Sequence, residues 1–345
     1  MDVTTLEWAI TIAATVGVLL FDVAVIARDP HEPTMKECAV ALTFYVGAAV
    51  AFGLFILLHH GTAYGVEFYT GWLTEYSLSI DNLFVFIILM AALKVPRKYQ
   101  QEALLVGIVL ALVFRGIFIA LGYALIQNFS WVFYIFGAFL VYTAFKLVKS
   151  YGSHEDEHPE DNAVVKFART HMRVGEAYHG LKLWYHENGV RFVSPMVIVI
   201  IALGVTDILF ALDSIPAIFG ITQEPYLVFT ANVFALMGLR QLYFLLGGLL
   251  QKLVYLSLGL AFILAFIGVK LVLHALHENE LPFINDGHHV TAAPDISSLF
   301  SLGVIIVTLV VTAVGSLWSS SRGAKAHVPE LEMDEVDDTA GPDWR

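Results

Sequence analysis

Charged residues are scarce in this sequence. Only 14% of its 345 residues are Asp, Glu, Lys or Arg, whereas about 25% is usual for a soluble domain. The one cysteine, Cys38, excludes an internal disulfide framework and any metal site built from several cysteines. The first residues, MDVTTLE, lack the basic stretch of a signal peptide, so we expect the first apolar segment to remain in the protein. A Walker A sequence is also missing, which argues against direct pumping driven by ATP.

Long apolar runs make up most of the chain, and 58% of all residues are hydrophobic. A run of about 20 apolar residues is long enough to cross a hydrocarbon core of about 30 Å. We therefore predict an all-α, polytopic membrane protein. Its expected partners include the lipid bilayer but no nucleic acid. The nine predicted transmembrane helices cover approximately residues 8–27, 38–58, 68–93, 103–126, 131–148, 193–219, 226–247, 253–273 and 299–318.

Basic residues outside the predicted spans all fall on one side of the membrane. If the side that holds the N-terminus is called side A, the loops near 59–67, 127–130, 220–225 and 274–298 share it and contain no Lys or Arg. The opposite side, side B, receives sixteen of the nineteen basic residues. By the positive-inside rule, side B is cytoplasmic. The sequence thus predicts a protein of the inner (cytoplasmic) cell membrane with its N-terminus outside and its C-terminus in the cytoplasm.

Two segments of the sequence look like copies of one unit. Glu75-YSLSI-Asp81-Asn82 and Asp207-ILFAL-Asp213-Ser214 each carry two carboxylates six residues apart, with a small polar residue after the second. The next span of each copy contains an arginine seven residues before a glycine, and the third span of each copy ends near a lysine. The landmarks of these later spans are Arg115, Gly122 and Lys146 in the first copy and Arg240, Gly247 and Lys270 in the second.

Each copy holds three spans, which is an odd number, so the second copy is predicted to lie upside down in the membrane. Inverted repeats are a recurring architecture of secondary transporters, with binding sites at the repeat interface near the midplane. We therefore expect one transmembrane domain over residues 1–320. Repeat 1 covers about 68–148, repeat 2 about 197–273, and a cytoplasmic loop about 149–192. Residues 321–345 read as an acidic, disordered tail.

Ionisable residues inside these spans are the strongest functional signal. Each charge at a helix centre costs about 2.5–3.5 kcal/mol, so such residues are rarely incidental. Within the repeats the four acids carry −4 and the two arginines +2, which leaves −2. Mutual neutralisation by salt bridges does not remove this remainder, although Arg115 and Arg240 suit a structural, charge-balancing role. The remainder suits a divalent cation, or protons that exchange with one.

Carboxylate, amide and carbonyl oxygens are ligands that favour Mg, Ca or Mn over Zn or Cu. Acids six residues apart do not share one face of a helix, because six residues turn it by about 600°. Either the helix is interrupted or its interior face is wide, and Pro216, shortly after Asp213, favours an interruption.

Other polar residues give weaker signals. Asp22 lies near the cytoplasmic end of the first span and is either a hydrated structural acid or an accessory ligand. Histidines of the outer loops could capture or release a metal but are more often plain solvated residues. They are His59, His60, His277, His288 and His289. The loop between spans 5 and 6 reads as a surface loop with an interfacial helix.

The two acid motifs, together with Phe114-Arg115-Gly116-Ile-Phe and Gly238-Leu-Arg240-Gln-Leu-Tyr-Phe, closely resemble the TerC family of integral membrane proteins. The resemblance covers about residues 5–320. It implies a fold related to the lysine exporter superfamily, with links to tellurium resistance and, in several bacterial branches, to manganese efflux. By motif, the metal site that the resemblance implies uses Glu75, Asp81, Asn82, Asp207, Asp213 and Ser214.

These observations favour a divalent metal exporter that is not an enzyme and holds no permanent cofactor, and the resemblance implies Mn²⁺ as its substrate. Burial favours the protonated form of a carboxylate, so a proton or another counter-ion could replace the metal when it leaves. The alternative is a tellurium-resistance component that acts as a scaffold for cytoplasmic resistance proteins. An intramembrane aspartyl protease is a poorer match, because its usual Gly-x-Gly-Asp context is missing around Asp81, Asp207 and Asp213.

Overall fold

The computed structural model describes residues 1–28, 33–129, 131–151, 175, 178, 183–187, 190–246, 255–277 and 296–321, with residues 279, 281, 284, 285, 288, 290 and 294 between the last two ranges. At a few positions inside helices, Asp22 and Asp81 among them, it describes the backbone alone. The predicted acidic tail and most of the predicted cytoplasmic loop lie outside the described residues.

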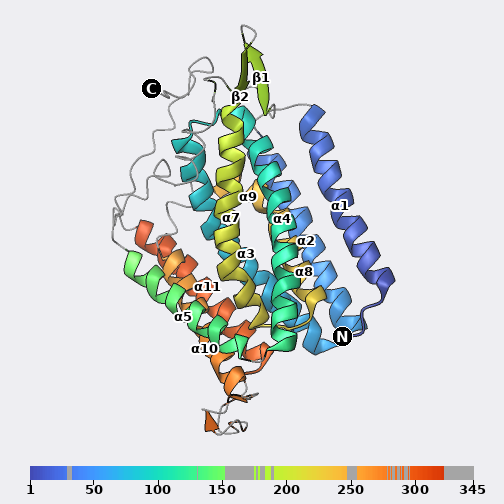
Figure 1. Ribbon diagram of the computed structural model, residues 1–345, viewed down its shortest axis with the longest axis vertical. Helices are drawn as coiled ribbons and strands as arrows, with labels where there is room; N and C mark the ends of the chain where they lie inside the picture. Colours follow the sequence, from blue (N-terminus) through green and yellow to red (C-terminus); the bar gives the residue numbers. More distant parts are fainter. Residues whose placement is uncertain are drawn as a thin grey trace.

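The described chain folds into long helices packed side by side (Figure 1). Helices dominate because a bilayer offers no hydrogen-bond partners, and a helix satisfies its own backbone groups. In chain order they are α1 (Thr5–Arg28), α2 (Met35–His59), α3 (Thr62–Ala92), α4 (Arg97–Asn128), α5 (Val132–Ser150), α7 (Pro195–Phe219), α8 (Pro225–Met237), α9 (Leu239–Leu246), α10 (Leu256–His277) and α11 (Ser298–Ser321).

The prediction of an all-α, polytopic membrane protein is confirmed. In the part of the chain that the structure describes, eight helical segments are long and apolar enough to cross a membrane. Helices α8 and α9 together form one of them, Pro225–Leu245, and α1 adds a shorter apolar stretch, Thr5–Val18, at the first predicted span. Each predicted span therefore coincides with a helix, except that the seventh, 226–247, is divided between α8 and α9.

The two ends of the bundle agree with the two predicted sides. Figure 1 places the start of α1 and the described residues between α10 and α11 at its lower end. The antiparallel strands β1 (Trp184–Glu187) and β2 (Val190–Val193) lie at its upper end. The lower end corresponds to side A and the upper end to side B, while the orientation in the cell stays a prediction.

The β1–β2 hairpin was not expected, because the loop was predicted to carry only an interfacial helix. Tyr185 and Phe192 face each other across the two strands, with ring centroids 6.0 Å apart. Between the strands the sequence reads Asn188-Gly189, which is the strongest short-range signal for a hairpin turn. The helix-like stretch of the loop lies outside the described residues.

Two helix pairs run antiparallel, as inverted repeats require. Helices α5 and α10 pack most closely near Gly137, where an added Cβ would lie 2.7 Å from the carbonyl oxygen of Gly268. At one end of the pair, the rings of Phe133 of α5 and His274 of α10 pack against each other, with centroids 5.0 Å apart. Helices α3 and α7 also cross antiparallel. Near one end of that crossing Gly71 packs on Ile218, and further along Phe86 meets Phe210. These directions are compatible with the predicted three-helix repeat, which itself stays a prediction.

The predicted interruption at Pro216 is wrong. Helix α7 continues through Pro216 and ends at Phe219, and α3 is also unbroken around its acid motif. A proline inside a helix removes one backbone hydrogen bond. A membrane helix tolerates this loss when neighbouring helices pack around the proline, and Pro216 is buried. The break falls instead at Gly238, between α8 and α9, where an added Cβ would lie 3.0 Å from Leu42 of α2. Continuous α3 and α7 leave the wide interior face as the remaining arrangement.

The contact at Gly137 gives a test of the packing. Replacing Gly137 by Leu should lower the free energy of unfolding by about 1–3 kcal/mol, because the side chain would push α5 and α10 apart. The measurement is thermal unfolding of the purified protein in detergent. Gly116→Leu on α4 is the matched control, since an added Cβ there meets no atom within 4 Å. Equal stability of the two variants would contradict the described helix contact.

Candidate functional site

A buried arginine joins four helices at the centre of the bundle. Arg115 of α4 is only 1% exposed, and its Nη1 donates to Glu75 Oε2 of α3 and to Asn232 Oδ1 of α8, both at 2.7 Å. Its Nη2 lies 3.6 Å from Asp207 Oδ1 of α7. Glu75 and Asp207 are themselves buried. The structure therefore brings together the first acid of each predicted motif around one guanidinium.

Asn232 is a site residue that the sequence reasoning missed. Its Nδ2 donates to the backbone carbonyl of Val228, one turn earlier in α8, at 3.0 Å. That bond turns Oδ1 toward Arg115 and so fixes which end of the amide accepts the guanidinium proton. The available signal was a single amide inside an apolar span, because polar residues inside a membrane usually bond across helices.

Several oxygen atoms around this ion pair lack partners. Among the described atoms, Glu75 Oε1 and Asp207 Oδ2 are buried and accept no hydrogen bond. The buried hydroxyls of Ser79 and Ser214 are also without a bond, although Ser214 lies next to Glu75. A buried unsatisfied polar atom costs about 1–3 kcal/mol, and more when it is charged. These oxygens are therefore positioned to take up a proton or a cation.

One of these residues, Ser214, also lines a small cavity of about 80 Å³. Its polar lining comes from three helices, with Asn82 of α3, Thr143 of α5, and Asp213 and Ser214 of α7. The Thr143 hydroxyl donates to Asp213 Oδ1 at 3.1 Å. The remaining wall is apolar and consists of Leu78, Leu147, Phe210, Leu260 and Leu264. Because one water molecule needs a cavity of roughly 10–15 Å³, this cavity is large enough for an ion with part of its water shell.

The predicted ligands thus fall into two adjoining groups. One group consists of Glu75 and Asp207 around Arg115, and the other of Asn82 and Asp213 at the cavity. Ser214 belongs to both, since it neighbours Glu75 and lines the cavity. The interior face of the two unbroken helices is wide enough to present all of these residues.

The side chains of two predicted residues, Asp81 and Asp22, lie outside the described atoms. Arg240, predicted to balance charge like Arg115, instead lines a separate cavity between α1, α2 and α9 and lies near Cys38. Its charge-balancing role stays a prediction. The described histidine, cysteine and carboxylate side chains form no group of three that could hold a metal ion. Any cation at this site would therefore need hydroxyl, amide or water oxygens in addition to the carboxylates.

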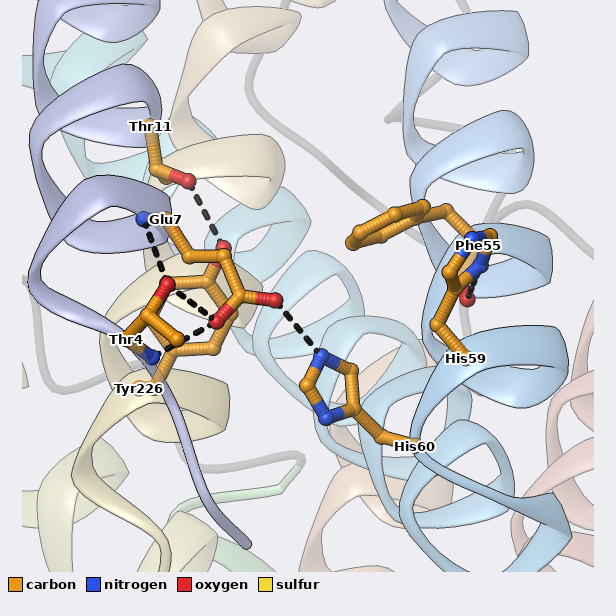
Figure 2. Close-up of polar contacts among 7 residues, drawn as sticks. All are labelled: Thr4, Glu7, Thr11, Phe55, His59, His60 and Tyr226. Atoms are coloured by element: carbon orange, nitrogen blue, oxygen red, sulfur yellow. Dashed lines mark hydrogen bonds and ion pairs between the residues drawn. The ribbon is translucent and has the colours of Figure 1, made fainter.

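The described outer histidines do not gather into a cluster. Figure 2 shows that the side chains of His59 and His60, although adjacent in sequence, serve different partners. His60 Nε2 lies 3.0 Å from Glu7 Oε1 of α1, whereas His59 Nδ1 lies 3.3 Å from the backbone oxygen of Phe55. The structure describes His277 and His288 as exposed, and His289 lies outside the described residues. The described part of the chain gives no support for an outer metal site.

Comparison with known proteins gives matches over most of the chain. The model of the Integral membrane protein TerC family matches residues 60–324. An uncharacterized membrane protein of Mycobacterium tuberculosis is 45% identical over 327 residues, which is 94% of this chain and 82% of that protein. A protein of Escherichia coli, Alx, whose name describes a membrane-bound redox modulator, is 36% identical over 307 residues, or 86% of this chain and 89% of that protein. No solved structure gives a significant match.

The buried ion pair can be tested by its stability. Arg115→Met should lower the free energy of unfolding by about 3–5 kcal/mol, because it leaves Glu75 and Asp207 buried without a countercharge. Adding Glu75→Gln should recover part of that loss, since one of the stranded charges is removed. Urea or thermal unfolding of the purified variants measures both effects. An Arg115→Met protein as stable as the original would show that the ion pair does not hold these helices together.

Proposed function

This chain belongs to the TerC family of integral membrane proteins, and we propose that it exports a divalent cation, Mn²⁺, from the cytoplasm across the inner membrane. The observation that carries the proposal is the cavity lined by Asn82, Asp213 and Ser214, of which Ser214 also neighbours Glu75 of the ion pair. The proposal takes Glu75, Asp81, Asn82, Asp207, Asp213 and Ser214 as the ligand set, with the cation as cargo.

The charge of the described site supports a divalent cargo. Glu75, Asp207 and Asp213 carry three negative charges and Arg115 one positive charge, which leaves −2. One divalent cation or two protons cancel the charge of these described side chains, and Asp81, whose side chain lies outside the described atoms, adds one more negative charge when it is ionised. Lys146 acts on Asp213 electrostatically, but its side chain is exposed on α5 and is free to turn toward water at the membrane surface.

The ligand chemistry points to a hard cation. The site offers carboxylate, amide and hydroxyl oxygens, which suit Mg, Ca or Mn better than Zn or Cu. The choice of Mn²⁺ among these rests on the resemblance to manganese-exporting branches of the family. Arg115 holds Glu75 and Asp207 in place but leaves one oxygen of each carboxylate unbonded for the cargo.

Exchange with protons follows from the same oxygens. When the cation leaves, the buried carboxylates that stay ionised no longer have a countercharge, which is energetically unfavourable. Binding protons removes this cost. The proton-loaded site is neutral and can return to the cytoplasmic side, so one site serves both fluxes in turn. This alternation makes the transport secondary active, with the proton or another ion as the counter-ion.

Reconstitution tests the proposal directly. The purified full-length protein in liposomes with an imposed pH gradient should move Mn²⁺, as read by a trapped metal-sensitive dye. Asp207→Asn and Asp213→Asn should reduce the rate at least tenfold, because each removes a charge that the cation needs. Glu187→Gln in β1, far from the site on the hairpin, is the matched control and should transport normally.

Experiments in cells distinguish the exporter from a scaffold for resistance proteins. Manganese sensitivity of cells that express Asp81→Asn or Asp213→Asn should follow the loss of efflux. If the reconstituted protein moves no Mn²⁺ and cells with Asp213→Asn keep full tellurite tolerance, the exporter proposal fails. A scaffold for cytoplasmic resistance proteins would then replace it.

A further inference from the structure

The hydroxyl of Thr143 on α5 is bonded differently from that of several other threonines in the bundle. The hydroxyls of Thr74, Thr308 and Thr312 each donate to the carbonyl oxygen four residues earlier in their own helix. The Thr143 hydroxyl donates instead to Asp213 Oδ1 of α7, at 3.1 Å. A threonine in a helix can satisfy its hydroxyl on its own backbone. The bond of Thr143 to another helix is therefore a specific feature of this position.

This bond leaves the lone pairs of the Thr143 oxygen available. A hydroxyl has one proton to donate and two lone pairs with which to accept. The proton of Thr143 is used on Asp213, and no group in the described part of the chain donates a hydrogen bond to the Thr143 oxygen. Thr143 is buried and lines the small cavity. Its oxygen can therefore coordinate a cation in the cavity while the hydroxyl proton stays on Asp213.

Thr143 extends the set of oxygen ligands at the cavity to a third helix. The cavity is also lined by the Asn82 amide of α3 and by the Asp213 carboxylate and Ser214 hydroxyl of α7. Hard cations such as Mn²⁺ bind about six oxygen ligands, so water molecules would complete the coordination of a cation held by these four residues. The cavity volume of about 80 Å³ has room for them.

Thr143 is also the polar side chain that the α5–α10 pair contributes to the described cavity lining. The other lining residues of this pair are Leu147, Leu260 and Leu264, which are apolar. A cation bound to Asp213 and Ser214 of α7 would therefore contact the pair through the Thr143 oxygen. The present bond of 3.1 Å is longer than the usual O–H···O distance of about 2.7–2.8 Å. Coordination of a shared cation would strengthen this connection between α5 and α7.

We propose that Thr143 is a direct ligand of the transported cation and that it links cation binding to the α5–α10 pair. This inference rests on the proposed export of a divalent cation. A threonine that only packed helices together would affect the stability of the protein but not its choice of metal. A ligand affects both the affinity for the cation and the choice of metal.

The affinity for Mn²⁺ is measured by isothermal titration calorimetry of the purified full-length protein in detergent. Thr143→Val keeps the shape of the side chain but removes the oxygen, so it should raise the Kd for Mn²⁺ about tenfold or more. Thr143→Ser keeps the hydroxyl and should retain most of the affinity. Thr308→Val on α11 is the matched control and should bind as the original protein does, because its hydroxyl donates to the Val304 carbonyl oxygen of its own helix, at 2.7 Å.

The choice of metal tests direct coordination. Thr143→Cys replaces the hydroxyl oxygen by a sulfur atom, and thiolate ligands favour Zn²⁺ over Mn²⁺. The ratio of the Mn²⁺ Kd to the Zn²⁺ Kd should therefore rise about tenfold or more relative to the original protein. Cys38 is present in both proteins, so it does not account for a difference between them.

The results separate this inference from the export proposal. If the original protein binds and moves Mn²⁺ but Thr143→Val binds it equally well, or Thr143→Cys leaves the metal ratio unchanged, Thr143 is not a ligand and the export proposal stands. An original protein that neither binds nor moves Mn²⁺ would overturn both. Thermal unfolding of each variant without metal separates lost binding from lost folding.

Discussion

The guanidinium of Arg115 is the constraint on which the interior of this protein depends. It is almost fully buried in a membrane-spanning helix, where a charge without partners would be too costly to keep. Its contacts with Glu75, Asp207 and Asn232 tie α4 to α3, α7 and α8. The first acid of each motif is therefore held by the same residue. The apolar surfaces of the helices alone would allow many other arrangements, because lipid tails are as apolar as leucine.

The same contacts leave part of the negative charge at the site uncompensated. Arg115 neutralises only part of the negative charge around it, and it bonds one oxygen of Glu75 while the other accepts no bond in the described structure. A second arginine at this point would have produced a closed, neutral salt bridge. Lys146 is exposed and Arg240 lines a separate cavity, so the described carboxylates at the ion pair and the small cavity keep an excess of negative charge, which a cation balances in our proposal.

Much of this was predictable from the sequence, because a bilayer limits the possible structures. Apolar length identifies each span, and the cost of buried charge marks Glu75, Arg115, Asp207 and Asp213 as candidates for the site. The break in a helix was placed wrongly, at Pro216 rather than Gly238, since a buried proline near a helix end is tolerated when neighbours pack around it. Asn232 and Thr143 were missed, because their importance depends on which helices become neighbours. The different environments of Arg115 and Arg240 were also hidden, since the internal repeat suggested equivalence.

The close approach of α5 and α10 at Gly137 and Gly268 has a mechanical consequence. Because the backbones of α5 and α10 are in contact, these helices cannot move closer together. Their close packing also resists separation, so they form one rigid pair. This helix pair lines one side of the small cavity, with Thr143 and Leu147 of α5 and Leu260 and Leu264 of α10. The opposite wall belongs to α3 and α7. If the protein transports a cation as we propose, opening the cavity to either side of the membrane would require α3 and α7 to move relative to α5 and α10, since these two are already in backbone contact.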